Sequence, residues 1–160
     1  MENRFGLSVV TLGIASLVIG IAEAAGEFGA AAFVDRLGKR RAVLIGLALT
    51  AIAYGALPAL GQRIEWALAG LAVLFIGFEF TIVSILPLIS ELAPGERATA
   101  MSANIAAMTT ARMMGSAAGT FLFARTGQLE ANAAVSVMAT VAAFVILWQF
   151  VREGPQTTDH

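Results

Sequence analysis

The chain has 160 residues, of which 58% are hydrophobic and only 13% are charged, and its formal net charge is −1. Soluble domains carry roughly 25% charged residues, so this composition and a mean hydropathy of +0.81 predict a membrane protein. The near-neutral charge excludes a basic field for binding nucleic acid, and the absence of cysteine excludes disulfides and thiolate metal sites.

Five apolar stretches reach the length of about 20 helical residues that a bilayer requires. They cover residues 5–34, 42–60, 66–89, 98–124 and 131–151. Alanine, leucine, glycine and methionine dominate these stretches, and the period-two alternation of strands is absent. The sequence therefore predicts an all-α polytopic membrane protein, with a transmembrane domain over residues 1–152 and a cytoplasmic tail over 153–160.

Basic residues between the apolar stretches predict the orientation. If the loop 35–41 faces the cytoplasm, that side carries Arg36, Lys39, Arg40, Arg41, Arg97 and Arg152. The opposite side carries only Arg4, Arg63 and Arg125. Because basic loops stay inside, we expect an external N-terminus and a cytoplasmic C-terminus in the plasma membrane, the inner membrane of a bacterium.

The first stretch has a competing interpretation. Arg4, the apolar run 7–21 and the small residues on either side of Glu23 are similar to a secretory signal with its cleavage site. The apolar residues continue to position 34 and then meet a basic loop. That continuation favours a transmembrane helix.

The loop after the first stretch carries a motif. Its core, Asp35-Arg36-Leu37-Gly38-Lys39-Arg40, resembles the signature loop of the major facilitator superfamily, Asp-Arg-x-Gly-Arg/Lys-Arg/Lys. Ala31 stands where the motif begins with glycine, which favours the second of the family's two copies. Residues 90–104 resemble the family's junction between its tenth and eleventh helices. On this resemblance the five stretches correspond to helices eight to twelve.

The resemblance implies an architecture of two six-helix halves and a function by alternating access around a midplane site. The chain would then correspond to one half-bundle without its first helix, as a fragment, a truncated product or a split subunit. Its expected partners are the lipid bilayer, a small-molecule substrate, protons as the candidate coupling ion, and the missing N-terminal half or a second copy. We expect part of a proton-coupled efflux permease. The alternative is a non-transporting protein that only packs helices.

The resemblance also implies a gating role for the signature loop. In the family, the carboxylate at the position of Asp35 faces the positive N-terminus of a helix in the opposite half. Arg36 and Arg40 would tie the cytoplasmic gate by charge-assisted hydrogen bonds, with Gly38 and Lys39 completing the motif. The alternative is that the loop only sets the topology.

Charged residues within the apolar stretches are candidates for a cavity or for coupling. The candidates are Glu23, Glu27, Glu79, Arg112 and the nearby amide Asn104. A charge at the centre of a membrane helix costs about 2.5–3.5 kcal/mol on insertion scales, so it usually faces protein or a water-filled cavity. The second and fifth stretches carry no charge, as the resemblance implies for peripheral helices. Glu79 and Arg112 are expected either to form a structural ion pair or to take part in proton coupling.

Enzymatic chemistry has little support in this sequence. The single histidine, His160, is the last residue, and no apolar stretch contains histidine or cysteine. No Gly-x4-Gly-Lys-Ser/Thr loop for nucleotide phosphates is present. We therefore expect no enzyme, no cofactor and no metal site.

Overall fold

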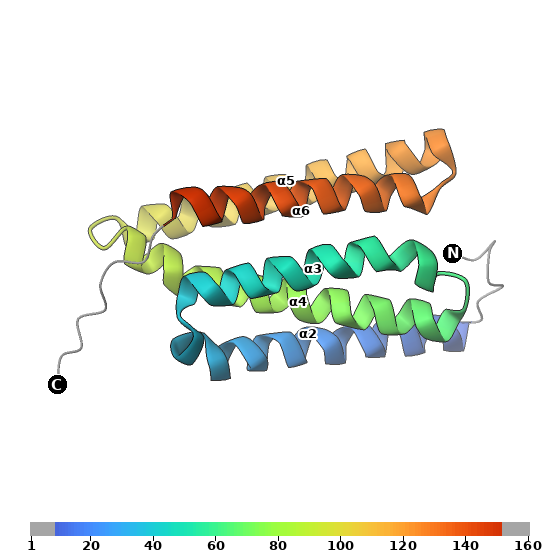
Figure 1. Cartoon of the computed structure of the whole chain (residues 1–160), viewed down its shortest axis with the longest axis horizontal. Coiled ribbons are helices and arrows are strands. Elements are labelled where there is room, and N and C mark those ends of the chain that lie inside the picture. The colour runs from blue at the N-terminus through green and yellow to red at the C-terminus, as the bar shows by residue number, and fades with distance from the viewer. Residues whose placement is uncertain (1–8, 152–160) are drawn as a thin grey trace.

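The computed structural model describes residues 9–151 and contains five long helices (Figure 1). They are α2 (Val9–Leu37), α3 (Lys39–Leu60), α4 (Ile64–Leu92), α5 (Arg97–Thr126) and α6 (Leu129–Phe150). Residues 9–151 contain no strand. The prediction of an all-α polytopic membrane protein with about five helices is confirmed. Residues 5–8 of the first stretch, Arg4, Arg152 and the tail 153–160 lie outside the described residues.

Glycine and short polar loops separate the helices. Gly38 ends α2 and starts α3 with φ 84°, and Gly127 ends α5 with φ 64°. Both are values that side chains with a β-carbon rarely adopt. Most helices extend two or three residues beyond the apolar stretches, because a helix continues into the interface where water solvates its charged residues. α2 also runs unbroken past Glu23, at the position of the alternative cleavage site.

Four of the five helices combine the length and the hydropathy of a transmembrane helix. These are α2, α3, α4 and α6. α5 has 30 residues and is therefore long enough to cross. Its apolar character is interrupted by Arg112 and by several serine and threonine residues, which lowers its hydropathy.

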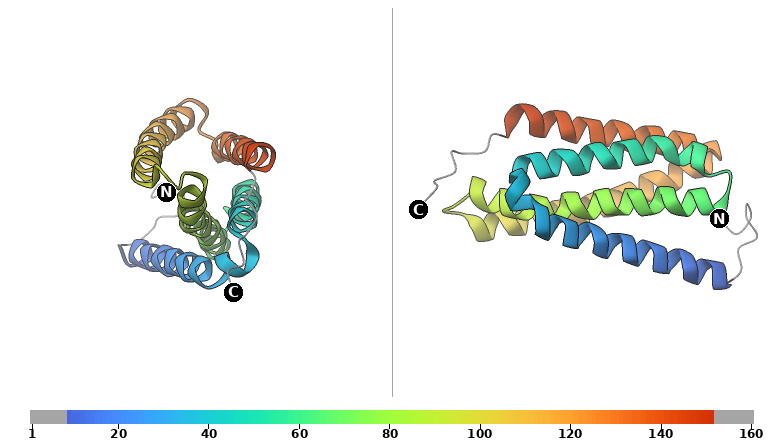
Figure 2. Two further views of the ribbon diagram at one scale, coloured as in Figure 1. Left: turned by 90° about the vertical axis from the view of Figure 1, so that its left-hand side faces the viewer. Right: turned by 60° about the horizontal axis from the view of Figure 1, so that its bottom comes forward.

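α4 occupies the middle of the bundle, with α2 on one side of it and α3 on the other. α6 packs on α3, and α5 lies beside α6, so the five helices form a curved arrangement whose ends are α2 and α5 (Figure 2). Asn132 of α6 donates a hydrogen bond of 3.1 Å to the Gly119 carbonyl of α5. α5 has no buried residue within the described chain. Its surface is therefore the least covered of the five.

Two Gly-x3-Thr steps bring α3 and α4 into close contact. The Thr50 hydroxyl donates to the Gly46 carbonyl at 2.8 Å, and the Thr81 hydroxyl donates to the Gly77 carbonyl at 2.7 Å. A β-carbon at Gly77 would lie 3.0 Å from Thr50 Oγ1, and one at Gly46 would lie 3.0 Å from the Thr81 amide nitrogen. Each threonine thus covers the glycine of the opposite helix. Small residues permit this close approach of two backbones.

Candidate functional site

A close contact between α2 and α4 places Glu79 against α2. A β-carbon at Gly26 would lie 2.7 Å from the Ile76 carbonyl oxygen and 3.0 Å from the Glu79 β-carbon. Gly26 is buried, and it has Glu23 three residues before it and Glu27 directly after it. The missing side chain of Gly26 therefore allows Glu79 to approach the two carboxylates of α2.

Three of the charged residues lie at a similar depth. Helices rise about 1.5 Å per residue, so Glu23, Glu79 and Arg112 each lie about 20 Å from the end of their helix nearest Gly38. These three helix ends are on the same side of the bundle (Figure 1). Glu23 and Glu79 are half-buried, whereas Glu27 and Arg112 are exposed. The charges thus gather near the middle of the bundle's length.

Glu79 is the centre of this group. Glu23, Glu27 and Arg112 are all near enough to interact electrostatically with its carboxylate. Within residues 9–151, Glu79 and Arg112 do not form a direct ion pair. The predicted residues Glu23, Glu27, Glu79 and Arg112 therefore form a loose cluster contributed by α2, α4 and α5. With three carboxylates and one guanidinium, the cluster is net negative when all four groups are charged.

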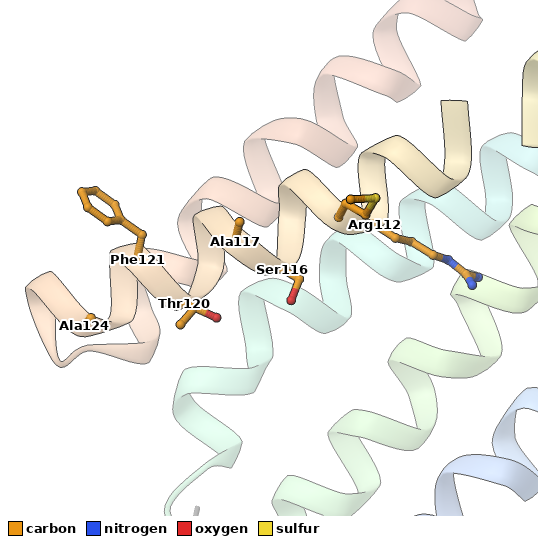
Figure 3. Close-up of a pocket in the computed structure, with 7 residues that line it drawn as sticks. Arg112, Ser116, Ala117, Thr120, Phe121 and Ala124 are labelled. Atoms are coloured by element: carbon orange, nitrogen blue, oxygen red, sulfur yellow. The ribbon is translucent and has the colours of Figure 1, made fainter. Parts of the chain in front are cut away.

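Arg112 also begins an open pocket along one face of α5 (Figure 3). Ser116 and Thr120 follow it at helical spacing, and Phe121 and Ala124 lie at the other end. Asn104 is half-buried and donates to Met108 Sδ at 3.5 Å within the same helix. Asn104 therefore has a partner other than Arg112. The Arg112 guanidinium points away from the Ser116 and Thr120 hydroxyls (Figure 3).

The signature loop connects three helices at its end of the bundle. Lys39, at the start of α3, forms an ion pair with Glu91, near the end of α4. A cation at a helix N-terminus and an anion at a helix C-terminus each interact unfavourably with the helix dipole, because each lies beside partial charge of its own sign. Pairing Lys39 with Glu91 offsets both, because the antiparallel helices place these two ends side by side.

Arg40 binds the end of α6. Its Nη2 donates to the Trp148 carbonyl at 2.7 Å, and its guanidinium carbon lies 5.0 Å from the centre of the Trp148 ring. The Trp148 carbonyl is one of the last four of α6, which have no partner within the helix. Arg40 therefore satisfies a helix end and forms a cation–π contact with the same residue.

Asp35 and Arg36 are exposed in the last turn of α2, and Gly38 provides the turn into α3. The structure thus divides the motif: Lys39 and Arg40 make contacts within the bundle, while Asp35 and Arg36 face outward. Glu91 and Trp148, the partners of Lys39 and Arg40, are not among the site residues predicted from the sequence. The sequence contains a signal for these contacts, because Glu91 and Trp148 each lie in the last turn of a helix that is predicted to end on the same side as the signature loop.

We expect the Lys39–Glu91 pair to contribute little to stability. Lys39 is 23% exposed and Glu91 is 53% exposed, so water screens their attraction. A double-mutant cycle with Lys39→Gln and Glu91→Gln, measured by unfolding in detergent, is expected to give a coupling energy of about 0.2–1 kcal/mol. A coupling energy well above that range would show that the pair is shielded from solvent.

The fold and the charge cluster define a polytopic helical membrane protein whose charged groups gather midway along three of its helices. The family model of the Major Facilitator Superfamily matches residues 1–160. The chain belongs to this superfamily of integral membrane transporters, whose solvent is the lipid bilayer and whose substrates are small molecules. A search of curated proteins and a search of solved structures each give no significant match.

Proposed function

We propose that the protein takes part in proton-coupled efflux of small molecules by alternating access, with its N-terminus outside and its C-terminus in the cytoplasm of a bacterial inner membrane. The observation that supports this is the cluster of Glu23, Glu27, Glu79 and Arg112 midway along three helices. Carboxylates at that depth are suited to bind and release protons, since charged side chains within the membrane are costly and usually functional.

The distribution of charged residues among the apolar segments strengthens the proposal. Residues 42–60 of α3 and 131–150 of α6 carry no charged side chain, whereas α2, α4 and α5 do. The need for apolar residues in a membrane helix does not by itself require that the charged residues fall on three helices and leave the apolar segments of the other two without any. We infer that α2, α4 and α5 face a hydrated pathway and that α3 and α6 face lipid.

Alternating access also needs a second bundle opposite α2 and α5. We propose that it is supplied by another half of the transporter or by a second copy. Asp35 and Arg36 would then contact it at the cytoplasmic side, with the Asp35 carboxylate near a helix N-terminus, where negative charge is favourable. This role is suggested by their exposure and by the family motif.

Reconstitution in proteoliposomes tests the function. An imposed pH gradient, with ethidium as a cationic probe and lactose as a neutral one, is expected to drive accumulation of one of them together with proton movement. A protonophore should abolish the accumulation. If neither probe nor protons move above the level of empty liposomes, the transport proposal for this chain fails.

A packing role is the second candidate. It is favoured by α5, which has no buried residue in the described chain and therefore leaves much of its surface open to a neighbour. The two proposals differ in one measurement. A packing subunit restores the flux of a partner protein when the two are reconstituted together, and Glu79→Gln leaves that flux unchanged.

A further inference from the structure

An apolar groove runs along the seam between α3 and α6. Ala48 and Ala51 of α3 face Val141 and Phe144 of α6 across it. A second hollow, lined by α6 alone, adjoins it at Phe144 and reaches Trp148. Phe144 and Trp148 are stacked, with ring centres 6.2 Å apart. The groove is thus walled by aromatic rings on one side and floored by alanine.

Basic residues stand at one end of this groove. Arg40 and Arg41 precede Leu47 and Ala48 by seven residues, which is close to two helical turns, so each pair shares a face of α3. Arg41 is exposed, and Arg40 is held against Trp148 by its hydrogen bond and ring contact. The same face of the bundle is therefore cationic at its end and apolar along its length.

The length of the groove matches one leaflet. Ten residues separate Arg41 from Ala51, a rise of about 15 Å. The hydrocarbon core of a bilayer is about 30 Å thick, so the groove spans half of it. Trp148 is 58% exposed at the cationic end, the interfacial position typical of tryptophan.

We propose that the groove between α3 and α6 binds an anionic phospholipid, with its phosphate at Arg41 and an acyl chain along Ala48 and Phe144. Arg41 supplies the charge for the headgroup, because Lys39 is paired with Glu91 and Arg40 binds the end of α6. Basic pockets between transmembrane helices recognise anionic headgroups by this combination of charge and apolar surface.

A second copy of the chain fits this face less well. A two-fold contact places the same patch of both copies together. That arrangement would bring Arg40 and Arg41 of one copy toward those of the other, with no carboxylate in the groove lining to offset them. Charge complementarity therefore favours a lipid over a self-contact.

Quenching of Trp148 fluorescence by brominated lipids tests the proposal. The chain has two tryptophans, so Trp66→Phe leaves Trp148 as the only reporter. The protein is reconstituted in phosphatidylcholine with a small fraction of lipid brominated near the headgroup end of the chain. Brominated phosphatidylglycerol is expected to give the same quenching as brominated phosphatidylcholine at an about fivefold lower fraction of the lipid. An about fivefold higher affinity is what one basic residue near the membrane surface confers on an anionic lipid.

Matched variants identify the site. Arg41→Gln is expected to remove the preference for phosphatidylglycerol. Arg125→Gln is the control, because Arg125 also lies over an aromatic ring, Phe121 at 4.8 Å, but at the opposite end of the bundle. Ala48→Phe fills the groove and should reduce quenching, whereas Ala139→Phe, on the opposite face of α6, should not.

Three results would overturn the proposal. Equal quenching by the two lipids shows that the groove does not select for the anionic headgroup. An unchanged preference in Arg41→Gln shows that the phosphate binds elsewhere. A Trp148 that neither lipid quenches shows that protein, such as a second copy, covers the groove. Circular dichroism checks that each variant keeps its helical content. The outcome is independent of transport, so it remains decisive if flux is not observed.

Discussion

Replacing Gly46 with leucine is expected to destabilise the protein by about 3 kcal/mol, at the upper end for overpacking of a close contact. A β-carbon at this position would lie 3.0 Å from the Thr81 amide nitrogen and 3.1 Å from the Gly77 carbonyl oxygen. These are backbone atoms, so no side-chain rotation relieves the clash and α3 must move away from α4. The free energy of unfolding in a detergent–SDS titration, followed by circular dichroism, measures the loss.

Gly115→Leu is the matched control. Gly115 is also inside a helix, α5, but nothing lies within 4 Å of the position where its β-carbon would stand. Leucine has a higher helix propensity than glycine by up to about 1 kcal/mol, so this variant should be as stable as the original chain or slightly more stable. Equal losses in the two variants would show that the α3–α4 contact is looser than the structure indicates.

The second prediction is that Glu79→Gln lowers proton-coupled flux by about tenfold or more, since a glutamine cannot bind and release a proton at neutral pH. Glutamine has nearly the same shape as glutamate, so the contact of residue 79 with Gly26 is kept. Helical content and stability should therefore change little. The measurement is the initial rate of probe accumulation in proteoliposomes under an imposed pH gradient.

Glu65→Gln provides the comparison for this experiment. Glu65 is an exposed carboxylate in the first turn of the same helix, far from the cluster around Glu79. Its substitution should leave the flux unchanged. Undiminished flux in Glu79→Gln would remove Glu79 from the coupling mechanism and leave a structural role for its charge.

Much of this architecture could be predicted from the sequence, because the membrane restricts the choices. Backbone groups in hydrocarbon must bond within their own segment, so an apolar stretch of sufficient length becomes a helix. Gly38 and Gly127 mark breaks that no tertiary contact is needed to explain. The signature-loop motif identified the family, which the match over the whole chain confirms.

The contacts between helices could be predicted from the sequence only in part. The charged residues Glu23, Glu79 and Arg112 were recognisable as exceptions in apolar stretches, but their approach depends on Gly26, whose role appears only when α4 lies against it. Lys39 and Arg40 were assigned together to a gating motif. Their partners, Glu91 and Trp148, are 52 and 108 residues further along the chain, respectively.

By itself, the sequence determined the class of protein, the number of helices and the family, since these follow from local composition and a short motif. Tertiary structure alone decided which glycines lie against a neighbouring helix and which have open space beside them. Only the tertiary structure decided which residues Lys39 and Arg40 of the signature loop contact. It also decided that the face of α3 and α6 has a cationic end and an apolar groove. The physical reason is that helix packing depends on which small residues meet across an interface, and spacing along one helix does not specify its neighbour.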